Sequence, residues 1–499
     1  MHWVDWLVIA VYAALILGIG WYAGRGAKSG ESHLRGDRSL PAWAVVFSIL
    51  ATEVSAATYV GVPERGFKGD WTYMAIAVGS LLGKILLATF FIRLYWRLNL
   101  TTVYGFLRDR IGPVTYVSSA WAFLLGRLIA SGVRMYIAAE AFCVVTGFDL
   151  PTAIVLMGVV STGYTLCGGL KGVVWTDVAQ GSLFFLGAAA TVAFALWKLG
   201  EPIGDVFGRA LDAGKLKIFT LEGDWFASSR SLPAAIVAGL FLNLASHGTD
   251  QENVQHLLNV KSEKGSARSV IISGLFTFPV VAMFLAVGTV LWAYHARFAA
   301  VGYDLSDTKR IFPNFIMYAL PPGLRGLVFA GLFAAAISSL AATLNATTSA
   351  WVTDLVRRPA LGDVASLRRT RRLMAGFGVV LTAVAGFFAW YARRPGATSD
   401  LVILALSASA IVYGGLLGCV SAALVLRKRG SDASTALGLG AGVLAGFGFF
   451  FQKEIFHLEA TVIDFGWALP ICALFAFLIA MLGRRAVGKF PPAVATGTA

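Results

Sequence analysis

The sequence predicts an all-α protein that crosses a membrane many times. Hydrophobic residues make up 57% of the 499 residues and charged residues only 14%, and the mean hydropathy is +0.73. A soluble protein of this length would need more charge to cover its surface. The apolar residues form runs long enough to cross a bilayer as helices, and the alternating ten-residue segments typical of a membrane β-barrel are not evident.

Hydropathy predicts about thirteen spans of roughly 20 or more residues each. The first is not a cleaved signal peptide, because it contains Asp5 and lacks both a basic start and a cleavage-site pattern. Four cysteines fall in apolar runs without the spacing of metal ligands or a redox pair: Cys143, Cys167, Cys419 and Cys472. The predicted spans lie near 3–24, 42–64, 71–96, 115–147, 151–168, 172–199, 231–258, 266–295, 324–354, 372–392, 399–426, 433–452 and 462–483.

Lys and Arg are unevenly divided between the loops. The excess lies inside if the N-terminus faces outward, and an odd number of spans then puts the C-terminus in the cytoplasm. The net charge of +14 is explained by topology and lipid contact, and no basic patch with interleaved aromatic residues suggests nucleic acid. We expect one transmembrane domain over 1–485, a disordered cytoplasmic tail over 486–499, and a location in a bacterial-type inner (plasma) membrane.

The span from 331 to 354 consists almost entirely of small or hydroxyl-bearing residues. Ala335, Ser338 and Ser339 stand at i, i+3 and i+4, so they share one face of a helix. Two hydroxyls and a backbone carbonyl, without formal charge, would suit a monovalent cation that must bind and then leave. Small residues also let helices pack closely, and each Ser can bond to the carbonyl one turn back. The stripe alone leaves both interpretations open.

Several ionisable residues lie inside predicted spans. Glu53 lies in the middle of the second span, where burying a charged carboxylate costs at least about 2.5–3.5 kcal/mol of free energy. It must therefore pair with a group such as a buried arginine, contact a solute or be protonated. Arg127 and Arg134 lie too far from the ends of the fourth span to reach water. Arg134 is suited either to neutralise Glu53 or to hold an anionic group. Asp177 stands one turn into the sixth span, where an acid most often complements the helix dipole.

Two spans contain polar interruptions at the same relative place. The second is interrupted over 51–58, and the seventh contains a polar run that begins at His247 and includes Asp250. Residues 42–199 and 231–426 therefore form two five-helix blocks of opposite orientation, with one helix before them and two after. Inverted repeats that open with interrupted helices are typical of alternating-access transporters, with the site between the breaks. A channel rich in loops would also show polar breaks.

The motifs at these positions resemble the sodium:solute symporter family over about 1–485. They are ILATEVSAATYVGVP, CGGLKGVVWTDVAQ, GTDQENVQ followed by LLNVKS, GLFAAAISSLAATLNATTS and IVYGGLLG, in that order. The resemblance, here to a bacterial member, implies the leucine-transporter (LeuT) fold and a sodium site between the second and ninth spans. It implies as ligands the carbonyls of Ala51, Val54 and Ala335 and the hydroxyls of Ser338 and Ser339.

The same resemblance makes Asp177 an inner-gate residue, which in some members joins a second sodium site. The further hydroxyls of that second site are replaced here by Ala341 and Ala342, so we expect one Na⁺ per solute. The solute contacts that it implies are Ser55, Thr58, Tyr73, Asp250 and Gln251, with Tyr413 as a further candidate. The charges of Glu53 and Arg134 inside spans make these two residues candidates as well.

The expected function is sodium-coupled import of a small organic solute by alternating access. Glu53 departs from the Asn of sugar carriers, and VGVPERGF is closer to the anion, monocarboxylate and vitamin branch, but the solute class stays open. We expect no enzyme, because no nucleophile–base pair or hydrolase-type metal spacing is present. We also expect no cofactor beyond Na⁺ as coupling ion, and no partner beyond the solute, Na⁺ and the bilayer. A proton-coupled or uncoupled carrier, with Glu53 or Asp250 as proton site, and a receptor or channel of the same fold are the alternatives.

Overall fold

The computed structural model describes residues 1–24, 40–98, 102–228, 230–298, 307–356, 364–394, 401–426 and 428–485. Within these ranges the regular elements are helices, which confirms the all-α class. The expected disordered tail over 486–499 lies outside the described residues. The N-terminal half contains α1 (Trp3–Gly24), α3 (Ala42–Glu53), α4 (Ala56–Lys68), η1 (Thr72–Met74), α5 (Ala75–Leu86), η2 (Leu87–Ile92), α6 (Arg93–Arg97), α7 (Val103–Arg110), α8 (Pro113–Thr146), α9 (Leu150–Leu199) and α10 (Ile203–Asp212).

The second half of the chain continues the helical pattern. In the described part, ten helices are long and apolar enough to cross a membrane, or up to twelve if each of two bent pairs is one span. The elements of this half are α11 (Leu232–Gly248), α12 (Gln251–Leu258), α13 (Glu263–Arg297), η3 (Thr308–Arg310), α14 (Ile311–Tyr318), α15 (Leu324–Ala350), η4 (Trp351–Leu355), α16 (Val364–Tyr391), α17 (Leu401–Val425), α18 (Asp432–Phe450), α19 (Gln452–Phe456) and α20 (Phe465–Leu482).

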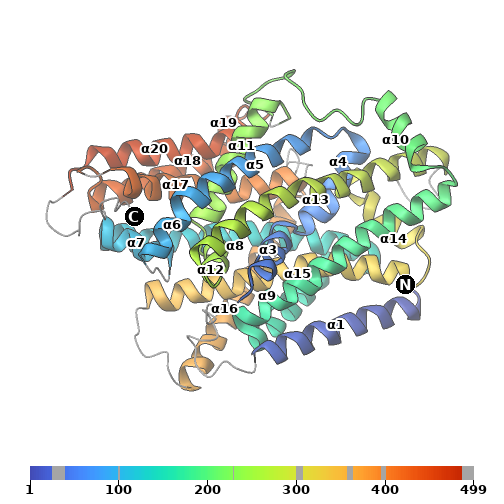
Figure 1. Ribbon diagram of the computed structural model, residues 1–499, viewed down its shortest axis with the longest axis horizontal. Coiled ribbons are helices and arrows are strands. Elements are labelled where there is room, and N and C mark those ends of the chain that lie inside the picture. Colours follow the sequence, from blue (N-terminus) through green and yellow to red (C-terminus); the bar gives the residue numbers. More distant parts are fainter. Residues whose placement is uncertain are drawn as a thin grey trace.

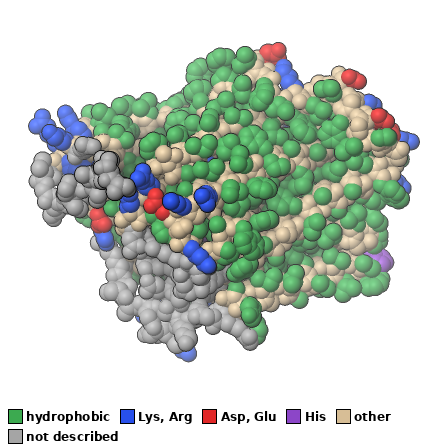
Figure 2. All heavy atoms as spheres, viewed as in Figure 1, with side chains coloured by type: hydrophobic (Ala, Val, Ile, Leu, Met, Phe, Trp, Pro, Cys, Tyr) green, Lys and Arg blue, Asp and Glu red, His purple; other side chains and the backbone are tan. Residues whose placement is uncertain are grey.

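The long helices run mostly along one direction, which is roughly horizontal in Figure 1. Figure 2 shows that hydrophobic side chains cover the middle of this face, while charged side chains gather toward its ends. A broad apolar band between charged ends matches the hydrocarbon core and interfaces of a bilayer. The surface therefore agrees with the many membrane spans predicted from the sequence.

Helix α9 occupies two predicted spans, 151–168 and 172–199. Its backbone is helical throughout, yet the hydroxyl of Tyr164 contacts the hydroxyl of Thr176. On a straight helix these residues would be about 18 Å apart along the axis, beyond the reach of both side chains. The chain therefore bends sharply between them, and Leu150–Leu166 and Gly172–Leu199 are separate apolar segments. The total of thirteen spans stays a prediction.

The two predicted helix breaks are confirmed. Helices α3 and α4 meet at 65°, and α11 and α12 meet at 67°. A break frees backbone groups that need new partners inside a membrane protein. At the second break the hydroxyl of Tyr95 donates to the Gly248 carbonyl at 2.5 Å, and that of Tyr104 donates to the Thr249 carbonyl at 2.9 Å. The Asp250 carboxylate caps α12 by accepting from the Glu252 amide at 2.8 Å.

The two five-helix blocks pack on each other through equivalent crossings. Helix α5, which follows the first broken pair, packs on α11, and α13, which follows the second, packs on α4. Small residues at such crossings let membrane helices approach closely. On each of four glycines a Cβ would overlap the backbone of the facing helix: Gly79 and Gly239 between α5 and α11, and Gly66 and Gly288 between α4 and α13.

The helices outside the blocks support their edges. Helix α1 lies along α9 and α15 (Figure 1), and α18 and α20 pack with α17. The buried carboxylate of Asp5 in α1 accepts hydrogen bonds from the amides of Gly323 at 2.8 Å and Gly326 at 3.1 Å. An anion at this place satisfies free amides and complements the dipole at the start of α15. The first helix thus anchors the helix that carries the small-residue stripe.

Candidate functional site

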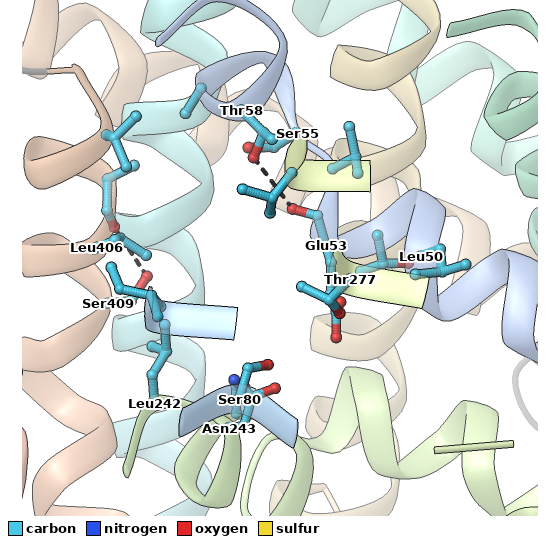
Figure 3. Close-up of a pocket in the computed structure, with 18 of the residues that line it drawn as sticks. Leu50, Glu53, Ser55, Thr58, Ser80, Leu242, Asn243, Thr277, Leu406 and Ser409 are labelled. Carbon is cyan, nitrogen blue, oxygen red and sulfur yellow. Dashed lines mark hydrogen bonds between the residues drawn. The ribbon is translucent and has the colours of Figure 1, made fainter. Parts of the chain in front are cut away.

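A cavity of about 170 Å³ lies between the two helix breaks. At the space that one water needs, it has room for on the order of ten water molecules. Figure 3 shows hydroxyl-bearing side chains around it: Ser55 and Thr58 from α4 and the break before it, Ser80 from α5, Thr277 from α13 and Ser409 from α17. Apolar residues such as Leu50, Leu242 and Leu406 complete the wall. The cavity is therefore suited to a small polar solute.

Most of the predicted solute contacts line this cavity, but two do not. Glu53, Ser55, Thr58, Tyr73 and Arg134 are lining residues, and so is the further candidate Tyr413. Asp250 and Gln251 are buried and lie outside the lining. The side-chain oxygen of Gln251 accepts from the amide of Val103 at 3.2 Å. Solute contact by Asp250 and Gln251 stays a prediction without support from their position.

Asp250 belongs instead to a buried charged cluster around Arg127. Nη1 of Arg127 lies 3.2 Å from Oδ2 of Asp250, and Nη2 contacts Oε1 of Glu252. Nε of Arg127 donates to the hydroxyl of Thr343 at 3.1 Å, and the hydroxyl of Tyr413 donates to Asp250 at 2.5 Å. The cluster joins α8, α12, α15 and α17 next to the cavity. Glu252 was missed from the sequence, although it stands in the polar run around Asp250.

Arg134 presents a positive charge to the cavity. It lies seven residues after Arg127, and therefore on the same face of α8. Among the described residues it forms no hydrogen bond or ion pair, although its side chain lines the cavity. A guanidinium in this position is suited to bind a carboxylate with two parallel hydrogen bonds.

The partners of Glu53 are Lys84 and His247, which its place in the sequence did not indicate. Its Oε1 lies 2.6 Å from Nζ of Lys84 and 3.0 Å from Nε2 of His247. Of the alternatives left open for Glu53, the structure therefore shows a pair, with Lys84 in place of a buried arginine, and Arg134 does not neutralise Glu53. The missed signal was a single lysine in the middle of the apolar third span.

The residues predicted to bind sodium all lie buried where α3 ends and α15 passes. Helix α15 packs on α3, and every side chain of the set is at most 3% exposed. The hydroxyl of Ser339 lies 3.3 Å from the Ala335 carbonyl, and that of Ser338 donates to Asp177 at 2.6 Å. No group of three or more His, Cys, Asp or Glu suited to a metal occurs among the described residues. This place therefore offers hydroxyls and backbone carbonyls to a cation, with the Asp177 carboxylate beside Ser338, and coordination by Ala51, Val54, Ala335, Ser338 and Ser339 stays a prediction.

Asp177 lies deeper than the sequence indicated. It is fully buried within α9 and accepts from the hydroxyls of Ser48 at 2.5 Å and Ser338 at 2.6 Å. Ser48 also lies 3.0 Å from Nδ1 of His256 in α12. Asp177 therefore joins α9 to α3 and α15 and does more than complement a helix start, while its role as an inner-gate residue stays a prediction. Ser48 and His256 gave no recognisable signal in the sequence.

Comparison with known proteins identifies similar chains. A sequence model of the sodium:solute symporter family matches residues 33–426. The sodium/sialic acid symporter SiaT of Proteus mirabilis is 28% identical over 360 residues, which is 71% of each chain. The human sodium-coupled monocarboxylate transporter 1 is 27% identical over 449 residues, 89% of this chain and 72% of that one. The sodium-dependent multivitamin transporter of Oryctolagus cuniculus is 29% identical over 397 residues, 77% of this chain and 61% of that one.

Solved structures share the fold. A Na⁺-coupled sialic acid symporter in a substrate-bound outward-open state superposes with a TM-score of 0.83 at 23% identity, covering 96% of this chain and 97% of that one. A transporter of the nucleobase-cation-symport-1 family superposes with a TM-score of 0.58 at 14% identity, covering 90% and 92%. Both likenesses extend over nearly the whole chain. The architecture of two blocks that each open with a broken helix is therefore shared with known membrane transporters.

Proposed function

Because the chain belongs to the sodium:solute symporter family, we propose that it imports a small organic anion together with one Na⁺ through the cavity between the helix breaks. Sodium-coupled symport is the activity of the family. The anionic solute, the single Na⁺ and the residues that bind them are our proposals, as is an orientation with the N-terminus outside and the C-terminus in the cytoplasm.

The charge of Arg134 carries the proposal for an anion. Arg127, which also lines the cavity, faces Asp250 and Glu252, and Lys84 behind the cavity wall faces Glu53. Arg134 has no such partner among the described residues. A positive charge in a largely buried cavity is stabilised by a carboxylate that arrives with the solute. The names of two relatives, a sialic acid symporter and a monocarboxylate transporter, agree with such a solute.

The oxygen atoms around α15 support one sodium ion. Because Ser338 donates its hydrogen to Asp177, the lone pairs of its oxygen stay available to a cation. Ser339 and the Ala335 carbonyl add oxygens on the same helix face. Ala341 and Ala342 are buried but bring no side-chain oxygen for a second ion.

The proposed sites for Na⁺ and the solute are neighbours at the first helix break, and this suggests how alternating access is coupled. Sodium bound outside would hold α15 to the end of α3 and complete the cavity wall for the solute. Each ligand then raises the affinity for the other by the same factor. On the inner side, release of Na⁺ is favoured by its low concentration, while the membrane potential contributes about 2.3 kcal/mol per charge per 100 mV to its entry. The solute leaves once sodium no longer holds the cavity together.

Uptake into proteoliposomes tests this function. Purified protein is given an inward Na⁺ gradient at fixed pH and offered labelled N-acetylneuraminate, lactate, pantothenate, glucose and galactose. We expect Na⁺-dependent uptake of at least one carboxylate and of neither neutral sugar. Arg134→Gln should lower that uptake at least about tenfold, a loss of roughly 1.4 kcal/mol of binding free energy. The exposed Arg209→Gln serves as control and should transport like the wild type.

Three results would contradict the proposal, each at a different point. Uptake of a neutral sugar alone would show that the solute is not an anion. Normal anion uptake by Arg134→Gln would remove the role of that guanidinium. Uptake that persists when K⁺ replaces Na⁺ and that follows a proton gradient would show that the coupling ion is H⁺ and not Na⁺.

A further inference from the structure

Lys84, Glu53 and His247 form a cluster that joins the two helix breaks; Lys84 and His247 are buried, and Glu53 is 23% exposed and lines the cavity. We call these three residues the Lys84 cluster. Nζ of Lys84 and Nε2 of His247 lie 2.6 Å and 3.0 Å from the same oxygen, Oε1 of Glu53. Glu53 is the last residue of α3, directly before the first break, and His247 lies in the last turn of α11, directly before the second. Lys84 on α5 therefore lies where both broken helices end.

The burial of Lys84 is costly and calls for a physical reason. Its side chain is 0% exposed, and its stem passes so close to α13 that a Cβ on Gly274 would lie 3.1 Å from Cδ of Lys84. A charged group inside a membrane protein is expensive to bury. A buried ion pair adds little stability over apolar residues of similar volume. Stability alone therefore does not account for Lys84.

The position of Glu53 links the cluster to the proposed sodium site. Glu53 lies between Ala51 and Val54, whose carbonyls are proposed sodium ligands, and the amide of Val54 still bonds to the Leu50 carbonyl at 2.9 Å. The end of a helix frays unless its last residues are held. Holding the Glu53 side chain therefore fixes the backbone that would present both carbonyls.

We propose that Lys84 is a positioning residue for sodium binding. Through Glu53 it fixes the end of α3. Through the contact of Glu53 with His247 it connects the first break, which carries proposed sodium ligands, to the second break between α11 and α12. This inference rests on the sodium site proposed above. It expects that loss of Lys84 weakens sodium binding although Lys84 contributes no ligand to the ion.

Sodium-dependent thermal stability of the purified full chain in detergent tests the inference. A ligand raises the unfolding temperature according to its concentration relative to its dissociation constant. Na⁺ is titrated with choline at constant ionic strength, so the probe is the ion itself. We expect Lys84→Met to need at least about ten times more Na⁺ for half of the stabilisation, and Lys84→Arg to recover part of that loss. Lys198→Met, which removes an exposed lysine, should titrate like the wild type.

Two further variants keep the test decisive. If Lys84 only supports the fold, Lys84→Met unfolds earlier in choline but keeps the wild-type half-saturation by Na⁺, and the inference is overturned. If Lys84→Met cannot be purified, the double variant Lys84→Met with Glu53→Gln removes both charges of the pair, and a wild-type half-saturation there overturns the inference equally. Ser339→Ala separates the two proposals. If it leaves the Na⁺ titration unchanged, the sodium site itself is wrong, whereas a shift in Ser339→Ala with none in Lys84→Met refutes only the positioning role.

Discussion

Replacing Arg127 by methionine should destabilise the fold strongly. Methionine fills a similar space, but it leaves Asp250 and Glu252 buried without their cation. These side chains are 0% and 1% exposed, so water cannot take the place of the guanidinium. Each carboxylate keeps one hydroxyl partner, Tyr413 at 2.5 Å for Asp250 and Thr343 at 3.0 Å for Glu252. Breaking a buried ion pair from one side costs about 3–5 kcal/mol.

The assay is thermal unfolding of the purified protein in detergent. At a few degrees per kcal/mol, Arg127→Met should unfold on the order of 10 °C below the wild type. The control is Arg209→Met, because Arg209 forms an ion pair of 2.6 Å with Glu201 but is 49% exposed. An exposed pair contributes at most about 1 kcal/mol. The control should therefore unfold within a few degrees of the wild type.

A double variant separates charge from packing. Adding Glu252→Gln to Arg127→Met removes one of the two unpaired carboxylates and should restore part of the lost stability. If the single variant unfolds like the Arg209 control, the cluster is not desolvated as its burial indicates. If the double variant is no more stable than the single one, the loss comes from packing, and our account of the charges is wrong.

Three further substitutions test other parts of the molecule. Ser339→Ala removes a proposed sodium ligand and should raise the Na⁺ concentration for half-maximal uptake at least about tenfold without reducing membrane insertion, and an unchanged sodium dependence would refute the assignment. Asp5→Asn weakens the bond to the Gly323 amide and removes a charge at the start of α15, so thermal unfolding should show a loss of about 0.5–2 kcal/mol, whereas no loss would mean that α1 does not anchor α15. Gly288→Val should lower the free energy of unfolding by about 1–3 kcal/mol or more, because the new side chain would overlap α4. The control Gly448→Val has open space around it and should change the unfolding temperature little. Equal unfolding temperatures of the two variants would contradict the close crossing of α4 and α13.

The sequence predicted those features that depend on local pattern. Hydropathy runs located the spans because each helix must cover a bilayer with apolar residues. The breaks were visible because a polar run such as the one from His247 to Asp250 has no place in an unbroken apolar helix. The stripe of Ala335, Ser338 and Ser339 followed from helical spacing and lies buried against the end of α3.

The sequence did not predict contacts between distant segments. Lys84 stands 31 residues after its partner Glu53, inside a run so apolar that one charge hardly changes the average hydropathy. Arg134 was the more visible candidate, because it lies near the middle of a long span, yet α8 directs it into the cavity. Asp177 was judged by its place in the chain, whereas Ser48 and Ser338 reach it from other helices. Helix packing decides which buried charges form pairs. The periodicity of the sequence does not contain that information.

A continuous chain of side-chain contacts connects the proposed sodium site to the cavity. The hydroxyl oxygen of Thr343 lies 2.9 Å from the Ser339 carbonyl and 3.0 Å from the Glu252 carboxylate, and it accepts from Nε of Arg127. Arg127 in turn lines the cavity. A change at Ser339 therefore reaches the cavity wall through one threonine, while Glu53 and His247 join the two breaks on another side. Because both routes consist of close contacts between side chains inside the protein, an ion that fixes one end restricts the other, which is the physical requirement for each ligand to strengthen the binding of its partner.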